Sequence, residues 1–256
     1  MTAAPPSPAT RPRGPAVLRA ATYNIHKGVQ GLGPARRLEI HNLALAVEML
    51  DADIICLQEV RRVNQREAAY FTGWPDLPQA DFLAPEGYES VYATNAFTRH
   101  GEHGNALLSR WPVVSWRHED ISDTRFEQRG LLHAQLLVGG RTLHVIVVHL
   151  GLIPASRRRQ AEQLRRYIRR EIAPAAPVLV AGDFNDWGSR VRRLLGQDAL
   201  HTLEGGRTLT YPSRMPVVQL DHIYARGLAP LSLMTPRGRA WRRMSDHLPL
   251  IAEFRM

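Results

Sequence analysis

The chain has 256 residues, 44% of them hydrophobic and 22% charged, which are values of a globular protein and exclude a largely disordered chain. Its single cysteine, Cys56, lies in an apolar run, which excludes a disulfide framework and favours a reducing, cytoplasmic location. The formal net charge of +9 predicts attraction to polyanions such as nucleic acid or anionic lipid headgroups. Lys27 is the only lysine among 33 basic residues, a bias that we attribute to genome composition rather than to function.

Residues 1–15 are rich in proline, alanine and arginine and contain no apolar core of the signal-peptide kind, so we expect a disordered tail. The remainder, residues 16–256, is expected to form a single domain, although its length is also compatible with two small ones. No apolar run approaches the length of a membrane span.

The folded part is predicted to begin with a strand, a helix and a second strand. Residues 17–23 predict a strand that ends in Asn24, and apolar residues at helical spacing predict a helix over residues 36–50. A second apolar run, residues 54–57, leads through a glutamine into Glu59. This order is typical of a crossover connection, which places both strand ends at the same edge of a sheet.

The middle of the chain predicts antiparallel strands. Residues 63–85 are irregular and predict a surface excursion with one short helix. The segments 131–138 and 141–149 flank a Gly-Gly pair, a strong signal for a hairpin, and the second of them ends in His149. Three short strand candidates precede this hairpin, at residues 88–93, 105–109 and 113–116.

Pro154 opens a helix that has one apolar stripe, and its many arginines predict a solvated face. The next run, residues 178–181, is apolar at every position, which indicates a strand buried on both faces. It leads into Asp183 and Asn185, whose side chains point the same way if the segment is extended. A simple turn is the competing interpretation, because Gly, Asp and Asn are ordinary turn formers.

The last third of the chain predicts a short helix and two strands. The helix is expected over residues 189–195. Residues 219–225 predict a strand that contains Asp221, and Asp246 and His247 directly precede a strand over residues 248–254.

Polar side chains thus stand beside apolar strands at many places. Unpaired carboxylates next to a core are costly and are usually kept there by a metal, a basic partner or catalysis. Oxygen ligands from Asp, Glu and Asn suit Mg²⁺ or Mn²⁺, whereas Zn²⁺ prefers more His or Cys. We therefore expect a divalent cation, Mg²⁺ or Mn²⁺. The residues concerned are Asn24, Glu59, His149, Asp183, Asn185, Asp221, Asp246 and His247.

Seven short motifs follow one another along residues 17–255: Thr22-Tyr23-Asn24, Leu57-Gln58-Glu59-Val60, Gly104 to Arg110, Val148-His149-Leu150, Gly182-Asp183-Phe184-Asn185, Leu220-Asp221-His222-Ile223 and Ser245-Asp246-His247. Together they resemble the ordered motif set of the endonuclease/exonuclease/phosphatase superfamily. That superfamily includes secreted deoxyribonucleases, abasic-site endonucleases, inositol polyphosphate phosphatases and neutral sphingomyelinases. The Asn-Ile-His-Lys-Gly and Gly-Asp-Phe-Asn-Asp-Trp segments most resemble a group of small bacterial members.

The resemblance implies an α/β fold of four layers, with two mixed β-sheets packed face to face and helices on the outer faces. It also implies that Glu59 ligates the divalent cation, with Asn24 and Asp246 close enough to ligate it or to orient its waters. Such a cation would supply positive charge at the non-bridging oxygens of a phosphodiester.

The remaining roles carried over by the resemblance are those of in-line attack on phosphorus. Asp183 is expected to activate the attacking water, and Asn185 to hold that water and a phosphate oxygen. His247, oriented by Asp221, is expected to hydrogen-bond the phosphate. His149 is expected to be a second phosphate contact or a proton donor.

Three departures narrow the resemblance. Abasic-site enzymes carry a tyrosine ahead of an Arg-Gly pair. This chain has Arg129-Gly130 but no tyrosine between Ser115 and Arg129, which argues against specificity for abasic sites. Arg129 is then expected to be a phosphate contact. Position 26 is histidine where those enzymes have an aspartate near the metal, so a weaker or different cation site is expected. One cysteine cannot form the disulfides of the secreted deoxyribonucleases.

The sequence therefore predicts a metal-dependent phosphoric ester hydrolase that cleaves phosphodiesters, with nucleic acid as the leading substrate. A phosphodiesterase or phosphatase acting on anionic phospholipid or on a small phosphoester is the alternative, because lipid headgroups attract the same positive charge. A binding protein that has lost the chemistry is a third hypothesis. It carries little weight, because every expected catalytic position holds a competent residue.

Overall fold

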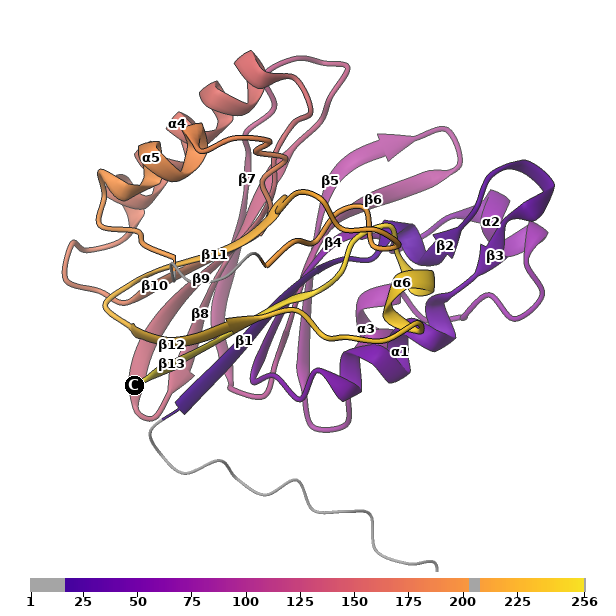
Figure 1. Cartoon of the computed structure of the whole chain (residues 1–256), viewed down its shortest axis with the longest axis horizontal. Coiled ribbons are helices and arrows are strands. Elements are labelled where there is room, and N and C mark those ends of the chain that lie inside the picture. Colours follow the sequence, from indigo (N-terminus) through magenta and orange to yellow (C-terminus); the bar gives the residue numbers. More distant parts are fainter. Residues whose placement is uncertain (1–16, 203–207, 256) are drawn as a thin grey trace, which may run out of the picture.

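The computed structural model describes residues 17–202 and 208–255, so the expected disordered tail at residues 1–15 lies outside the described part. Two β-sheets pack face to face and helices cover the outer face of each, which is the four-layered α/β sandwich that the sequence predicts (Figure 1). Within the described residues, no helix is both long and apolar enough to cross a membrane.

The first sheet has six strands and is mixed. β1 and β4 run parallel, which confirms the predicted crossover, and the other neighbouring strands are antiparallel. The strands lie in the order β12 (Ala229–Met234), β13 (Leu250–Arg255), β1 (Val17–Asn24), β4 (Ile54–Val60), β6 (Gly101–Ser109) and β5 (Glu89–Thr98).

The second sheet has five strands. β8 and β9 form the predicted hairpin, and β9 and β10 run parallel, so that both end at the same edge. The strands lie in the order β11 (Asp221–Arg226), β10 (Val178–Asp183), β9 (Arg141–His149), β8 (Gly130–Val138) and β7 (Val113–Asp120). A short ribbon of β2 (Val29–Gln30) and β3 (Arg37–Leu38) stands apart.

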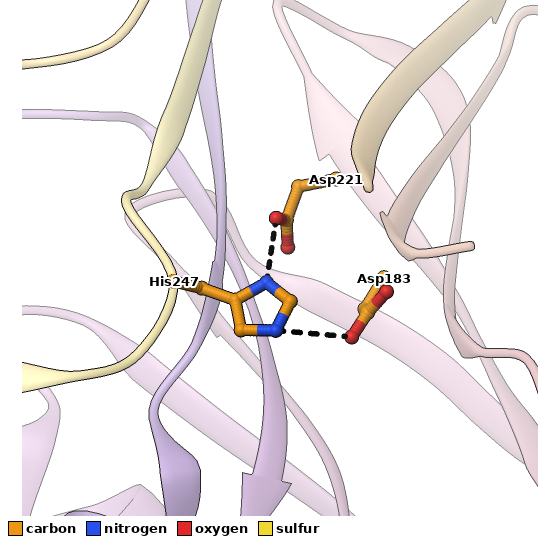
Figure 2. Close-up of side chains that lie close together, drawn as sticks. All are labelled: Asp183, Asp221 and His247. Carbon is orange, nitrogen blue, oxygen red and sulfur yellow. Dashed lines mark hydrogen bonds and ion pairs between the residues drawn. The ribbon is translucent and has the colours of Figure 1, made fainter. Parts of the chain in front are cut away.

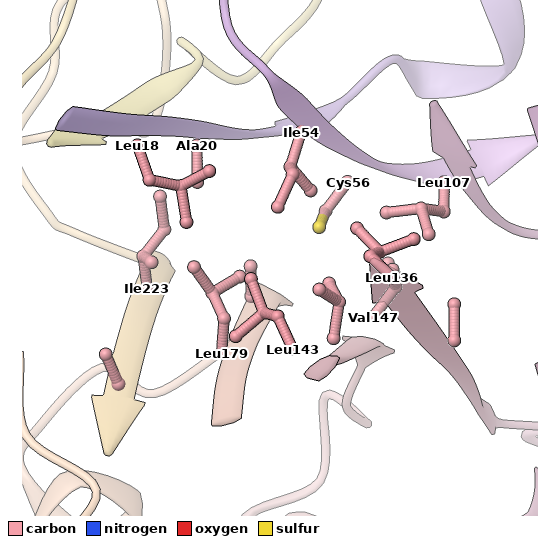
Figure 3. Close-up of a cluster of buried hydrophobic side chains, with 14 of the residues drawn as sticks. Leu18, Ala20, Ile54, Cys56, Leu107, Leu136, Leu143, Val147, Leu179 and Ile223 are labelled. Atoms are coloured by element: carbon pink, nitrogen blue, oxygen red, sulfur yellow. The ribbon is translucent and has the colours of Figure 1, made fainter. Parts of the chain in front are cut away.

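The core between the sheets explains why β10 is apolar at every position. Leu179 and Ala181 face the other sheet, where they join a cluster that includes Leu18 and Ile54 (Figure 3). Val178 and Val180 point to the opposite face and pack under the helices. Alternate side chains of one strand therefore fill two separate cores, as expected for a strand inside an α/β sheet.

Helices close both outer faces. Those over the six-stranded sheet are α1 (Ile40–Met49), α3 (Gln79–Leu83) and α6 (Trp241–Met244), and those over the five-stranded sheet are α4 (Pro154–Glu171) and α5 (Arg190–Gly196). The single-turn helices η1 (His26–Gly28) and η2 (Gly33–Ala35) and the short α2 (Gln65–Tyr70) lie in connections.

Several predicted boundaries are wrong for physical reasons. The first helix begins at Ile40 instead of residue 36, because Arg37 and Leu38 pair with β2. The excursion over residues 63–85 contains two short helices instead of one. The sequence does not predict β12, because this edge strand has mostly exposed side chains and so lacks an apolar pattern. It does not predict α6 either, because that helix has only four residues.

The arginines of α4 only partly form a solvated face. Arg157 is buried, and its Nη1 donates to the carbonyl oxygens of Gly151 and Leu152 at 3.1 and 3.0 Å. Arg169 is mostly exposed and pairs with Asp198. Arg157 therefore fixes the loop between β9 and α4, next to the ends of the strands.

Candidate active site

Strand register places three of the predicted residues side by side at one edge of the five-stranded sheet. Asp183 at the end of β10 lies opposite His149 at the end of β9. It also lies opposite Asp221 at the start of β11. Because all three positions follow or begin apolar strands, the sheet itself brings their side chains together.

A β-bulge directs Glu59 into the same region. Leu57 pairs with Ala106 and Val60 pairs with Gly104, which leaves Gln58 and Glu59 together opposite a single residue of β6. Glu59 has a φ of 57°, in the left-handed region that non-glycine residues rarely adopt. A bulge of this kind turns a side chain away from the regular alternation of its strand.

Asn24 joins the two sheets at the site. It ends β1, and its Nδ2 donates to Asp183 Oδ2 at 3.1 Å, across a separation of 159 residues in sequence. Ser245 holds the C-terminal loop to the same strand end by donating from Oγ to the Asn24 carbonyl oxygen at 2.6 Å. This loop delivers Asp246 and His247, so strand ends from both sheets and the last loop meet at one place.

His247 lies between two carboxylates (Figure 2). Its Nδ1 is 2.8 Å from Asp221 Oδ2 and its Nε2 is 3.6 Å from Asp183 Oδ2. Burial acts to lower the pKa of His247, but the negative charges of Asp221 and Asp183 outweigh it and raise the pKa to about 10. The ring is therefore an imidazolium at neutral pH, with both N–H groups directed at carboxylates.

This arrangement makes a prediction about alkaline pH. Because the pKa of His247 is raised to about 10, its stabilising contribution is complete below its unfolded pKa of about 6.5 and is lost as the pH rises through the folded value. We expect Asp221→Asn to lower the pKa of His247, measured from its ring proton resonances by NMR. The metal-free wild type should lose melting temperature between pH 7 and 10, and Asp221→Asn should lose less. A His247 pKa that is unchanged by Asp221→Asn would contradict this assignment.

Asp183 and His149 form a second buried pair. Asp183 Oδ2 lies 3.5 Å from His149 Nε2. Burial raises the pKa of Asp183 even though both histidines oppose the shift. Burial and the charge of Arg129 lower the pKa of His149 to about 4, despite Asp183 and Glu59. His149 is accordingly neutral at pH 7.

The backbone around Asp183 is tightly fitted. A side chain at Gly182 would place its Cβ 1.9 Å from the Val148 carbonyl oxygen, so only glycine lets β10 lie this close to β9. The Asn185 backbone N–H donates to Asp183 Oδ1 at 2.9 Å, and its side-chain Nδ2 donates to the Leu150 carbonyl oxygen at 2.9 Å. Asn185 has a φ of 49°, so the chain turns after Asp183 instead of continuing as the expected extended segment, and the Asn185 N–H fixes the Asp183 carboxylate.

Two of the three predicted metal ligands, Glu59 and Asp246, each meet a basic side chain from the turn after β1. Lys27 Nζ lies 2.8 Å from Glu59 Oε2, and His26 Nδ1 lies 3.2 Å from Asp246 Oδ1. Burial raises the pKa of Glu59, but the charge of Lys27 outweighs it and the pKa is lowered well below its usual range. The pKa of Asp246 is likewise lowered, because the hydrogen bond from His26 and the charge of His247 outweigh burial.

The donor atoms fit a divalent cation at Glu59. Oε2 of Glu59 is buried and, apart from its contact with Lys27, has no hydrogen-bond partner among the residues that the structure describes. Asn24 contributes an amide oxygen and Asp246 a partly exposed carboxylate at the same strand ends, and oxygen donors of this kind suit Mg²⁺ or Mn²⁺.

A second group with metal-ligand spacing consists of Asp183, Asp221 and His247, whose ligand atoms lie within 4.8 Å of one another. In this group both ring nitrogens of His247 already face carboxylate oxygens, at 2.8 Å from Asp221 and 3.6 Å from Asp183. The Glu59 group offers oxygen donors alone, and it stays the predicted cation site.

Arg129 lies close to His149 but is already engaged. Its Nη2 donates to Glu127 Oε1 at 3.2 Å, and its side chain is mostly buried. Its charge contributes to the low pKa of His149. The predicted phosphate contact of Arg129 stays a prediction.

Sequence reasoning missed Lys27, His103 and Tyr211. His103 lies on β6, and burial and the charge of Lys27 lower its pKa to about 4. The Tyr211 ring lies 4.9 Å from the His247 ring and 6.2 Å from that of Trp187. The sequence could have drawn attention to Lys27, because it is the single lysine of the chain and lies inside the Asn-Ile-His-Lys-Gly segment.

The fold and the assembled strand ends define a class of protein, and comparison with known sequences agrees with them. The sequence model of the endonuclease/exonuclease/phosphatase family matches residues 21–247, so the chain belongs to this family. Members of the family are generally hydrolases that act on phosphoesters.

The chain is also similar in sequence to one uncharacterized relative and in fold to several solved structures. It is 37% identical over 246 residues to YbhP of Escherichia coli K12, covering 93% of this chain and 96% of YbhP, a protein described as uncharacterized. The mannosyl-6-phosphatase Bt3783 of Bacteroides thetaiotaomicron superposes with a TM-score of 0.72 at 17% identity, covering 93% of this chain and 99% of that chain. D. rerio TDP2, complexed with a single-strand DNA product, superposes with a TM-score of 0.67 at 18% identity, covering 94% and 99%.

Proposed function

We propose that the protein is a cytoplasmic, divalent-metal-dependent phosphodiesterase that hydrolyses its substrate by attack of a water activated by Asp183. The observation that carries this proposal is the setting of the Asp183 carboxylate. It is buried, its Oδ2 accepts from Asn24, and the same oxygen faces the imidazoles of His149 and His247. A raised pKa suits a carboxylate to accept a proton near neutral pH.

His247 and His149 have different proposed roles toward the phosphate. The His247 imidazolium, held by Asp221, brings positive charge and an N–H group to the place where a phosphate oxygen becomes more negative. Neutral His149 serves as a hydrogen-bond donor to the phosphate. Asn185 keeps the Asp183 carboxylate directed at the water.

Glu59, with Asn24 and Asp246, is the proposed holder of the cation, Mg²⁺ or Mn²⁺. When bound, that cation supplies Lewis-acid stabilisation of a phosphoryl oxygen. The chain's own contribution is a buried carboxylate fixed by a β-bulge, beside the residues that position the water.

Nucleic acid is the leading substrate on electrostatic grounds. The net charge of +9 favours a polyanion. A groove of about 590 Å³ adjoins the segment after Asn185. Its lining includes Trp187 and the exposed Arg158 and Arg190, together with Asp186 and several apolar side chains. Basic side chains beside an exposed aromatic ring fit a phosphate backbone with a stacking base.

A specific surface feature favours a second candidate, a phospholipid. The connections next to the strands that carry the site, together with the end of β5, carry exposed apolar side chains. Several of them are aliphatic, and such side chains contribute little to nucleic-acid binding but can enter a bilayer interface. The exposed apolar side chains are Leu32, Phe97, Phe126, Leu152, Ile153, Trp187, Met215 and Val217.

The two substrates are separated by binding of the inactive Asp183→Asn protein to single-stranded DNA, duplex DNA, RNA and anionic vesicles over a salt series. For nucleic acid we expect binding that weakens steeply with salt, with a log-log slope of about −0.7 to −0.9 per phosphate contacted. A small phosphoester should show a shallower dependence. Binding to vesicles but to none of the nucleic acids would replace the leading substrate with phospholipid.

A further inference from the structure

The basic side chains at the proposed metal ligands come from one strained turn. His26 and Lys27 have φ values of 45° and 61°, and Gly28 follows with a φ of 73°. Consecutive non-glycine residues in the left-handed region persist only where the surroundings hold them, and they cluster at functional sites.

Two neighbouring side chains, those of Asn24 and Gln79, hold this turn. The His26 N–H donates to Asn24 Oδ1 at 3.0 Å. Buried Gln79 of α3 donates from Nε2 to the Lys27 carbonyl oxygen at 2.9 Å. At Gly28 a Cβ would lie 2.8 Å from the same Gln79 nitrogen, so a side chain there would have to displace Gln79. The turn is thus a fixed platform for the two side chains that it presents.

Lys27 contacts the Glu59 carboxylate oxygen that would bind a divalent cation. Its Nζ lies 2.8 Å from Glu59 Oε2, which is otherwise without an aligned hydrogen-bond donor among the described residues. An ammonium and a divalent ion at one carboxylate oxygen repel each other, so both cannot hold it closely. The Lys27 side chain is partly exposed, and a lysine has a flexible stem that lets its charge move away.

We propose that Lys27 is a displaceable counter-ion of Glu59. It neutralises the buried carboxylate while no divalent cation is bound, and it leaves Glu59 when the cation binds, so that it sets the metal affinity of the site. This inference rests on the proposed function in one respect, namely that a divalent cation binds at Glu59.

The first test is Mn²⁺ affinity, measured by electron paramagnetic resonance on the full chain. Lys27→Met removes the competing charge and keeps the length of the side chain, so it should bind Mn²⁺ about threefold to tenfold more tightly than wild type. Arg62→Met, an exposed arginine just after β4, controls for general loss of positive charge and should stay within about twofold. An affinity in Lys27→Met no higher than in Arg62→Met would overturn the inference.

Lys27→Arg distinguishes the effect of losing the positive charge from the effect of disturbing the turn. It keeps a cation at Glu59 and should show no gain in affinity over wild type. An equal gain in Lys27→Arg and Lys27→Met would attribute the effect to the turn and overturn the proposal.

The second test uses the fact that Lys27 is the only lysine. Reductive methylation with ¹³C-formaldehyde gives one dimethyl-lysine signal besides that of the α-amino group. We expect this signal to shift on Mg²⁺ addition in wild type and to stay in place in Glu59→Gln. If wild type binds Mn²⁺ but its Lys27 signal does not shift, the proposed displacement of Lys27 is wrong, while the metal-dependent function is not affected. Wild type that binds no Mn²⁺ at all contradicts the metal-dependent function as well.

Discussion

Asp183→Asn is expected to lower the turnover of a phosphodiester by about 10² to 10⁴. The amide has nearly the shape of the carboxylate but cannot accept a proton from water. The loss follows from the position of the Asp183 carboxylate, which is buried and shares one oxygen with Asn24 and two histidines. The measurement is the single-turnover rate at saturating metal, so that metal affinity does not enter.

A matched control for this substitution lies at the other sheet, directly before β4. Asp53, at the start of β4, is also buried and accepts from the Arg19 N–H at 2.9 Å and from Arg110 at 2.8 Å. Asp53→Asn should lower the melting temperature while the turnover of the folded protein stays at the wild-type level. A turnover in Asp183→Asn within about tenfold of wild type would remove Asp183 from the role of base.

Glu59→Gln is expected to have the largest effect on metal binding. Removing the charge of the proposed principal ligand should weaken Mg²⁺ or Mn²⁺ binding by at least the 10- to 100-fold that loss of a supporting residue causes. Isothermal titration should show a much smaller change for Asp183→Asn, because that residue is assigned to the water and not to the cation.

Glu67 provides the control for Glu59. It is a buried glutamate on α2 that pairs with Arg36 and Arg61 and is not among the proposed ligands. Glu67→Gln should leave metal affinity unchanged. A larger loss in Asp183→Asn than in Glu59→Gln would instead favour the group formed by Asp183, Asp221 and His247 as the cation site.

Much of the fold and several site positions could be predicted because their signals are local. The run over residues 178–181 is apolar at every position, and the strand is indeed packed on both faces. The polar residue at the end of such a run marks the edge of the sheet. Asn24 and Asp183 were both found in this way, although they touch across 159 residues of sequence.

The parts that sequence could not supply depend on tertiary structure. The bulge at Glu59 exists because β4 pairs with β6, which lies some fifty residues further along. The turn at His26 and Lys27 is held by Gln79 from a helix in an irregular segment. Lys27 stands out in the sequence as the single lysine. Its contact with Glu59, however, depends on a left-handed backbone that no propensity favours.

The central claim is tested most directly by hydrolysis of a chromogenic phosphodiester by wild-type protein as free Mg²⁺ is varied. The account predicts that activity rises with Mg²⁺, disappears in excess chelator and returns when Mg²⁺ or Mn²⁺ is restored. Full activity in excess chelator, or no hydrolysis of any phosphodiester by folded protein saturated with metal, would contradict it.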